Sequence, residues 1–224
     1  MSVRVAFDVS AIPPKLTGAG VFVARLVESL ATLDDVSLAL VTRRDDAPRW
    51  TSFGDVHALA PTARPSRLLW EQRSGPAAAA ATGASVWHGP HYTLPLRVGV
   101  PTVVTVHDLT FFDHPETHER SKVLFFRRMI RAACKRADAV VSVSERTTSR
   151  LRELVAVTGE LVTIPHGVDT SHFSPDGPRE DRGYPYVLFW GTIEPRKNVD
   201  GLVRAFARLH RSHPDLRLVL AGLP

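Results

Sequence analysis

Cysteine and long apolar runs are what this 224-residue sequence has least of. Cys134 is the single cysteine, so an internal disulfide is excluded and a reducing compartment is expected. No stretch reaches the roughly 18 consecutive apolar residues of a membrane-spanning helix. From Met1 the sequence enters a strand-like segment directly, without the parts of a signal peptide. We therefore predict a cytoplasmic protein.

Several signatures of catalytic and metal sites are also missing. The sequence contains no Gly-x-Ser-x-Gly elbow, no Asp-x-Asp pair and no Gly-x-Gly-x-x-Gly fingerprint. These absences disfavour hydrolases, transferases that hold a divalent metal on carboxylates, and dinucleotide enzymes. Histidine pairs occur at His88 and His91 and at His114 and His118, but a proline interrupts each pair. No metal cofactor is predicted.

The remaining composition is that of an ordinary globular protein with a basic balance. Hydrophobic residues make up 44% and charged residues 23%, with a net charge of +5 and a pI of about 9.9. The positive charge permits nucleic acid, a phosphorylated metabolite or an anionic membrane face as a partner. Composition does not choose among them.

Apolar runs alternate with helical periods along most of the sequence. Runs such as VRVAFDV, TVVTV and LRLVLAG are nearly continuous, which is typical of parallel strands covered on both faces. Helical spacing of apolar residues occupies 20–33 and 198–212. This alternation predicts right-handed β-α-β units and a Rossmann-like α/β fold. The expected strands are 3–11, 36–42, 85–87, 101–109, 138–144, 161–165, 186–190 and 216–221.

Proline, glycine and charge gather in 168–185, which we interpret as a linker. It separates an N-terminal Rossmann-like domain, 1–167, from the start of a second one, 186–224. The second part holds one β-α-β unit, too little to close a doubly wound domain, so it is expected to be incomplete. Its open sheet edge after Ala221 invites pairing with another chain. The region 43–67 is expected to be a surface connection.

Two candidate sites follow strands of the first domain. The sequence TGAG opens the first helix, where the backbone of Gly18 and Gly20 would approach an anion, although a plain tight turn explains these glycines equally well. His107 and Asp108 end the TVVTV run, at the carboxyl edge where open α/β sheets present ligand groups. A histidine there can donate to a sugar hydroxyl, or simply bond a neighbouring carboxylate.

The third candidate site is GTIEPRKN, in which Arg196 and Lys197 lie at the predicted start of the last helix. The helix dipole disfavours cations there by about 0.3–1 kcal/mol. A bound diphosphate would offset that cost, since Arg offers a bidentate fork and Lys a mobile charge. Asn198 is a natural N-cap. The alternative is a pair of solvated cations compensated by Glu194.

The segment 121–137 reads as a basic amphipathic helix. Its apolar stripe includes Phe126, Ile130 and Ala133. Its other positions include the cations Lys122, Arg127, Arg128, Arg131 and Lys135. Packing on the sheet with a solvated basic face is the ordinary interpretation. Peripheral association with the inner face of an anionic membrane is compatible with it.

Taken together, GTIEPRKN, HD after TVVTV, TGAG, SVSE and IPHGVD resemble, in this order, family-4 glycosyltransferases of the GT-B fold. The resemblance covers essentially the whole chain and implies two facing Rossmann-like domains. It also implies retaining transfer of a sugar from a nucleotide-diphosphate donor, without a metal. Arg196 and Lys197 would bind the donor diphosphate and stabilise the departing nucleotide. Gly18 and Gly20 would approach the same phosphates or the acceptor, and His107 would contact the transferred sugar.

The same resemblance suggests the substrates. EPRKN with HDLTFF looks like bacterial mannosyltransferases of polysaccharide assembly, which makes GDP-mannose a plausible donor. A glycan or a lipid-linked glycan is the expected acceptor, and nucleic acid is not an expected partner.

The sequence departs from the family at two points. The acidic Glu-x7-Glu motif of the second domain does not occur before Pro224, so the chain by itself is expected to be inactive or impaired. His166 stands where Asn is more usual. Two other classes stay open. One is a non-catalytic half-transferase that acts as a binding module at a membrane or subunit interface. The other is a different Rossmann-like enzyme of phosphorylated metabolites, which the poor dinucleotide signature disfavours.

Overall fold

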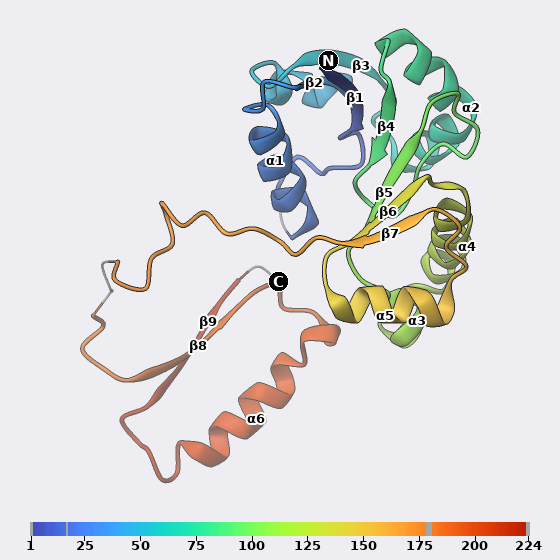
Figure 1. Cartoon of the computed structure of the whole chain (residues 1–224). Coiled ribbons are helices and arrows are strands. Elements are labelled where there is room, and N and C mark those ends of the chain that lie inside the picture. The colour runs from blue at the N-terminus through green and yellow to red at the C-terminus, as the bar shows by residue number, and fades with distance from the viewer. Residues whose placement is uncertain (1, 17, 178–180, 223–224) are drawn as a thin grey trace. The chain divides into compact units, whose positions relative to one another are not determined.

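The computed structural model describes residues 2–16, 18–177 and 181–222. The chain divides into two compact units, Met1–His166 and Gly167–Pro224 (Figure 1). None of the helices in the described ranges has the length and apolarity that crossing a bilayer requires.

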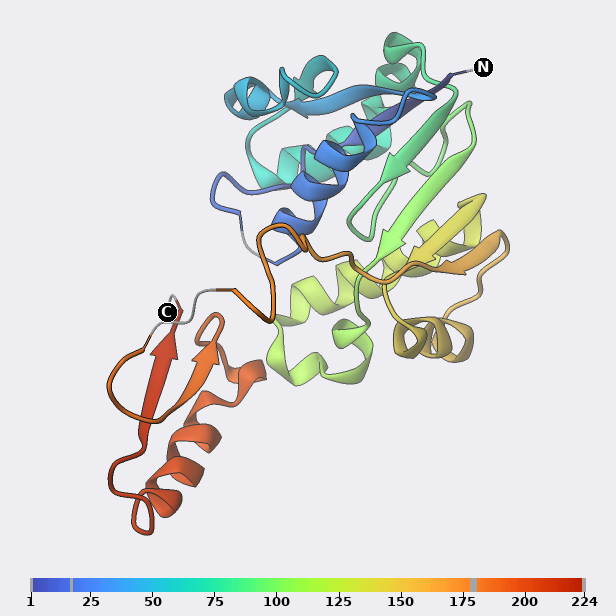
Figure 2. The same ribbon diagram turned by 60° about the vertical axis from the view of Figure 1, so that its left-hand side comes forward.

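A seven-stranded parallel sheet forms the centre of the first unit. Its strand order is β3-β2-β1-β4-β5-β6-β7, which reverses direction between β1 and β4. Such a reversal is the point where open α/β sheets bind ligands, beyond the carboxyl ends of the strands. The arrowheads of β4 and β5 point toward that edge in Figure 2. The strands are β1 (Val3–Asp8), β2 (Val36–Arg43), β3 (Asp55–Ala60), β4 (Val86–Gly89), β5 (Thr102–Val106), β6 (Ala139–Ser142) and β7 (Glu160–Thr163).

Helices cover both faces of this sheet, as the continuous apolar runs predict. Neighbouring side chains of a strand point to opposite faces. Phe7 of β1 therefore packs with Val27 of one helix, while Ala6 joins a separate core cluster that includes Ile130 and Leu151. The elements are α1 (Ala19–Leu30), η1 (Arg44–Trp50), α2 (Arg64–Thr82), α3 (Thr110–Asp113), η2 (Pro115–Thr117), α4 (Arg120–Arg136) and α5 (Glu145–Leu154). The predicted Rossmann-like α/β fold is confirmed.

The prediction that 43–67 is a surface connection is wrong. That region holds η1, β3 and the start of α2. Proline and glycine within α2 hide it in the sequence. Pro65 lies in the first helical turn, where its missing N–H costs nothing. Gly75 is needed because a Cβ there would lie 2.6 Å from Cγ of Pro95.

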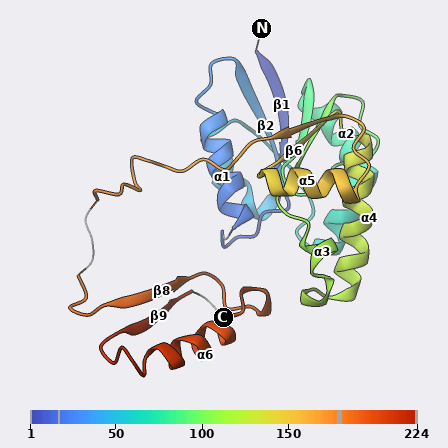
Figure 3. The same ribbon diagram turned by 60° about the horizontal axis from the view of Figure 1, so that its bottom comes forward.

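The second unit contains one parallel strand pair and one helix, and Figure 3 shows the helix lying along the pair. Its elements are β8 (Tyr186–Trp190), η3 (Pro195–Lys197), α6 (Val199–Leu209) and β9 (Arg217–Ala221). Side chains of Tyr186, Leu188 and Trp190 share one face of β8 by alternation and are 38%, 54% and 81% exposed. This sheet therefore presents an apolar face that the described residues of its own unit, 167–177 and 181–222, leave exposed.

Candidate functional site

A cavity of about 430 Å³ lies at the carboxyl ends of β1, β2 and β4, beside the switch point of the first sheet. Its wall is built from the loop after β1, the start of α1, the end of β2, the start of α2 and the loop after β4. Gly20, Arg43, Asp45, Arg67 and His91 are among its lining residues. Parallel strands bring these distant segments together because all of them end at one edge.

Two arginines hold the loop after β1 in place. The buried Arg43 donates through Nη1 to the carbonyl oxygens of Ser10 and Ile12, at 2.8 and 2.6 Å, and through Nε to Asp45 at 3.2 Å. Arg49 donates to the carbonyl of Pro14 at 2.6 Å. Much of the hydrogen-bonding capacity of these guanidinium groups is therefore used on the protein itself.

A buried ion pair supports the other side of the cavity. Arg67 Nη1 lies 3.1 Å from Glu71 Oε2, and the hydroxyl of Thr93 donates to the same carboxylate oxygen at 2.8 Å. Burial raises the pKa of Glu71 to about 6, although Arg67 opposes the shift. The carboxylate is therefore mostly ionised at neutral pH and compensates Arg67.

His107 lies beside this cavity, in a group of aromatic rings. Its Nε2 lies 2.9 Å from the carbonyl oxygen of Pro90, which can only accept, so Nε2 carries the proton. The ring centroid is 5.6 Å from that of His91, a cavity residue, and 5.1 Å from that of Phe22. Burial is the main cause that lowers the pKa of His107, with a further contribution from His166. A neutral imidazole is thus held at the end of β5, next to the cavity.

Gly18 and Gly20 of the TGAG motif, the predicted anion site, have different surroundings. Thr17 of the TGAG motif lies outside the described residues. Gly18 adopts a φ of +45°, which a side chain would strain, and it precedes α1 without a side-chain capping bond. Gly20 lines the cavity and packs near Leu16. Contact of either glycine with phosphate stays a prediction.

Arg196 and Lys197 belong to the second unit, in the turn η3 rather than in the helix itself. The helix α6 begins at Val199, and Asn198 separates it from the cations with a left-handed φ of 51°. Asn198 occupies the predicted N-cap position, but its side chain makes no capping bond, so that part of the prediction is wrong. It packs instead over Gly201, where a Cβ would lie 2.5 Å from its Oδ1. The cations therefore oppose the helix dipole less than the sequence suggested.

One of the two cations is paired within the turn. Arg196 Nη2 lies 2.6 Å from Oε1 of Glu194, and both side chains are about one-third exposed, 36% and 38%. No ion pair of Lys197 is found in the described part of the chain. Pairing by Glu194 is what the solvated-cation alternative expected, and it leaves the diphosphate role of both residues as a prediction.

Sequence reasoning misses Arg43, Asp45 and Arg67 because the scattered prolines and arginines of 43–67 predict a surface connection. A signal was present, since Arg43 is the last residue of β2 and His107 directly follows β5, at the same edge of the sheet. Arg67 had no such signal, because its helix is hidden by Pro65 and Pro76. Among the described residues, no group of three His, Cys, Asp or Glu side chains is placed to hold a metal ion.

Comparison with known proteins places the chain among glycosyltransferases. The family model "Glycosyltransferase Family 4" matches residues 16–172, and "Glycosyl transferases group 1" matches 172–224. The O-antigen chain mannosyltransferase B of Escherichia coli is 29% identical over 133 residues, covering 55% of this chain and 35% of that protein. A GDP-mannose-dependent phosphatidylinositol monomannoside mannosyltransferase of Mycolicibacterium smegmatis is 36% identical over 104 residues, covering 43% and 27%. The chain thus spans only about a quarter to a third of the length of these relatives.

Solved structures agree on the fold. The Anabaena protein HepE, in complex with UDP and glucose, matches 99% of this chain with 62% of its own length, at a TM-score of 0.63 and 16% identity. The Staphylococcus aureus protein MnaA, in complex with UDP, matches 99% and 62% at a TM-score of 0.52 and 14% identity. Identities this low show the fold alone. Since the first family model covers more than half of the sequence, the chain belongs to glycosyltransferase family 4.

Proposed function

We propose that this chain is the acceptor-side domain, with the opening of the donor-side domain, of a retaining glycosyltransferase. The enzyme moves a sugar, with mannose as the first candidate, from a nucleotide-diphosphate donor to a glycan or lipid-linked acceptor in bacterial polysaccharide or glycolipid assembly. Family membership supports the reaction class, and relatives named for mannosyl transfer support the choice of sugar.

The observation that carries the proposal is the basic turn η3 after β8. Departure of a nucleotide diphosphate develops negative charge, and positive groups aimed at that charge stabilise the transition state. Arg196 and Lys197 supply two such groups at the carboxyl end of a parallel strand. In the proposed bound state, the diphosphate replaces Glu194 as the partner of Arg196. The cations take the role that a metal takes in other transferases, so no metal is required.

His107 has the second role in this proposal. Nε2 of its neutral ring donates to the Pro90 carbonyl, so Nδ1 is the nitrogen left to accept from a hydroxyl of the transferred sugar, beside the cavity at the carboxyl ends of β1, β2 and β4. Gly18 and Gly20 bring the start of α1 near the substrates.

Calorimetric titration of the chain with GDP-mannose, and in parallel with UDP-glucose, tests the donor claim. Arg196→Ala and Lys197→Ala are each expected to weaken binding about tenfold or more, the loss of one charge-assisted contact. Arg204→Ala, which removes an exposed cation from α6 of the same unit, is the matched control and should leave the affinity unchanged. Equal affinities for all three variants would count against the diphosphate role.

A binding module without catalysis is the second candidate, and the surface of α4 favours it. The apolar stripe of α4 is used for packing, since Phe126, Ile130 and Ala133 are buried. Arg128, Arg131 and Lys135 of the same helix remain exposed. Such a basic face attracts an anionic membrane.

Co-sedimentation with lipid vesicles tests the membrane partner. The chain is expected to bind vesicles that contain phosphatidylglycerol and not neutral vesicles, and Arg128→Gln with Arg131→Gln should reduce binding. Vesicle binding without transfer of labelled mannose by a chain that binds the donor would favour the module over the enzyme. Equal binding to both vesicle types would remove the membrane from the proposal.

A further inference from the structure

We infer that the cavity at the carboxyl ends of β1, β2 and β4 binds an uncharged, hydroxyl-rich unit of the acceptor and selects against a phosphorylated one. Its role as the acceptor site depends on the proposed transferase function, but its ligand chemistry follows from the cavity wall alone.

The first step is that the positive charges of Arg43 and Arg67 in the wall, and of Arg49 next to it, are already paired with carboxylates. Arg43 is 6% exposed and bonds Asp45 at 3.2 Å, with Asp46 at 4.0 Å from its Nη2. Arg49 lies 3.0 Å from the other oxygen of Asp46. Together with the Arg67–Glu71 pair, three guanidinium groups face three carboxylates.

The second step is what this balance does to an incoming anion. A phosphate site offers cations whose partners are missing until the ligand arrives. Here a phosphate would enter beside Asp45. Burial by itself would raise the pKa of this carboxyl, but the charge of Arg43 and several hydrogen bonds together lower it, so the group is ionised. The negative charges of the phosphate and of the Asp45 carboxylate would repel each other. The wall therefore disfavours a phosphorylated ligand in spite of its arginines.

The third step is that neutral hydrogen-bonding capacity remains. Within the described residues, Nη2 of Arg43 is buried without a hydrogen-bond partner, so the polar atoms that a ligand can reach are those of Asp45 and Thr62. Asp45, 43% exposed at its side chain, and the hydroxyl of Thr62, 3.2 Å from it, line the same wall. A sugar hydroxyl can donate to the Asp45 carboxylate and to the Thr62 oxygen, which both accept.

The fourth step concerns size and the apolar part of the wall. Ile12, Pro13, Leu68 and Phe126 line the cavity together with these polar groups. Carbon–hydrogen faces of a sugar ring can pack on them. A volume of about 430 Å³ lies in the usual range of small-molecule sites. Since His91 lines the cavity and its ring neighbours that of His107, a ligand here also lies close to the predicted catalytic histidine.

Amide NMR titration of the 224-residue chain tests the inference without a donor. The probes are methyl mannoside, methyl glucoside, methyl galactoside and myo-inositol, each compared with mannose 6-phosphate. At least one neutral probe is expected to shift signals of the cavity wall at millimolar concentration. Mannose 6-phosphate should bind more weakly, by about fivefold or more.

The variant Asp45→Asn distinguishes binding in the cavity from binding elsewhere on the surface. It is expected to weaken the neutral probe about fivefold and to strengthen mannose 6-phosphate. Asp55→Asn is the matched control, since Asp55 pairs with Arg4 at the opposite edge of the same sheet, and it should change neither affinity. Tighter binding of mannose 6-phosphate by the unaltered chain, no shift with any neutral probe, or equal effects of the two variants would each overturn the inference. Donor binding through Arg196 is measured separately, so the transferase proposal can fail while saccharide binding persists, and the reverse.

Discussion

The imidazole ring of His166 stacks on that of His107, with centroids 6.0 Å apart and an angle of 27° between the planes. Phe22 of α1 contacts both rings. His166 is the last residue of the first unit, so the end of that unit is packed directly on the predicted catalytic histidine. Since one ring lowers the pKa of the other, the identity of residue 166 tunes the protonation of His107.

Replacement of His166 by Asn is therefore expected to raise the pKa of His107. The neutral amide removes the electrostatic effect of a second imidazole, while burial continues to hold the pKa below its ordinary value. NMR titration of the His107 ring signals measures the change. His172→Asn, an exposed histidine of the second unit, should leave the titration unchanged. An unaltered or lower pKa in the His166 variant would contradict the prediction.

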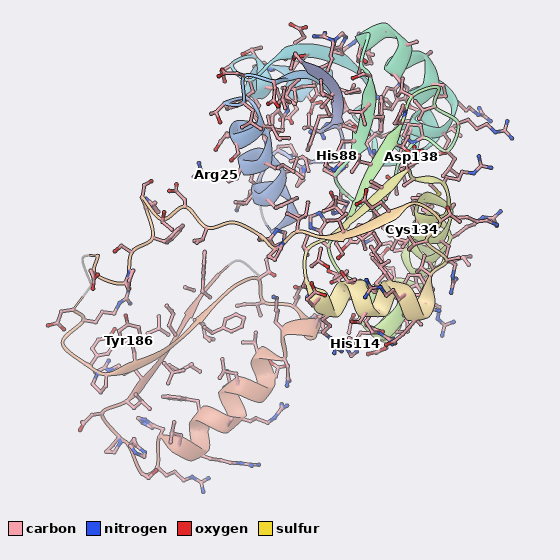
Figure 4. All side chains as sticks on the ribbon, in the orientation of Figure 1. Arg25, His88, His114, Cys134, Asp138 and Tyr186 are labelled. Carbon is pink, nitrogen blue, oxygen red and sulfur yellow. The ribbon has the colours of Figure 1, made fainter. Side chains whose placement is uncertain are left out.

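His88 makes the stability of the first unit depend on pH. The residue is labelled in Figure 4 within the first unit. Its ring packs against Phe7, with Nε2 2.9 Å from the hydroxyl of Thr105, and burial lowers its pKa to about 4. The unfolded chain binds a proton near pH 6.5. Between pH 6.5 and 4 the unfolded state therefore binds more protons than the folded state, and stability falls as the pH falls, by about 3 kcal/mol in all.

Urea unfolding at several pH values measures this dependence. In His88→Gln the pH slope of the unfolding free energy should be smaller by about one proton over this interval. The comparison is made between variants because the raised pKa of Glu71 contributes with the opposite sign, its stabilisation being lost as the pH rises through about 6. His114→Gln, at an exposed position, should keep the original slope. A parallel slope in the His88 variant would show that the buried ring is not responsible.

Substitution of Gly222 is expected to destabilise the second unit more than substitution of a glycine such as Gly167, where a Cβ would have free space. A Cβ at this position would overlap the carbonyl oxygen of Gly191, and Gly191 itself has a φ of +151°. Gly222→Ala must separate the ends of β8 and β9, at a cost of about 2 kcal/mol or more. Hydrogen exchange of the β8 and β9 amides reports this loss. Gly167→Ala, where a Cβ meets nothing within 4 Å, should have no such effect, and equal exchange in both variants would refute the steric argument.

Trp190 is expected to drive self-association of the isolated chain. The ring is 81% exposed on the same face of β8 as Leu188, and β8–β9 is a strand pair with open edges. Light scattering during size-exclusion chromatography should show a mass that rises with concentration. Trp190→Ser should lower that mass toward the monomer, whereas Trp70→Phe in α2 should not. A monomer at all concentrations would contradict the prediction.

The α/β class and most strands followed from the sequence by itself. Continuous apolar runs such as TVVTV mark strands buried on both faces, and their order along the chain implies parallel β-α-β units. Local chemistry also marked the turn before the last helix, because glycine, proline and paired cations have distinct backbone and charge signatures. These signals depend only on residues close together in the chain, so they can be recognised without knowledge of the fold.

The cavity was decided only by the tertiary structure. Ser10, Arg43, Arg67 and His91 are far apart in the chain, and they meet because four segments end at one edge of a parallel sheet. Pro65 and Gly75 disfavour a helix in the sequence. The structure explains Gly75, because the side chain of Pro95 occupies the space that a Cβ there would need. Whether an arginine can bind an anion or is already paired with a carboxylate likewise depends on residues that become its neighbours only in the folded structure. Residue types and their periodicity thus determine which elements form, while charge pairing across the sheet edge determines what those elements can bind.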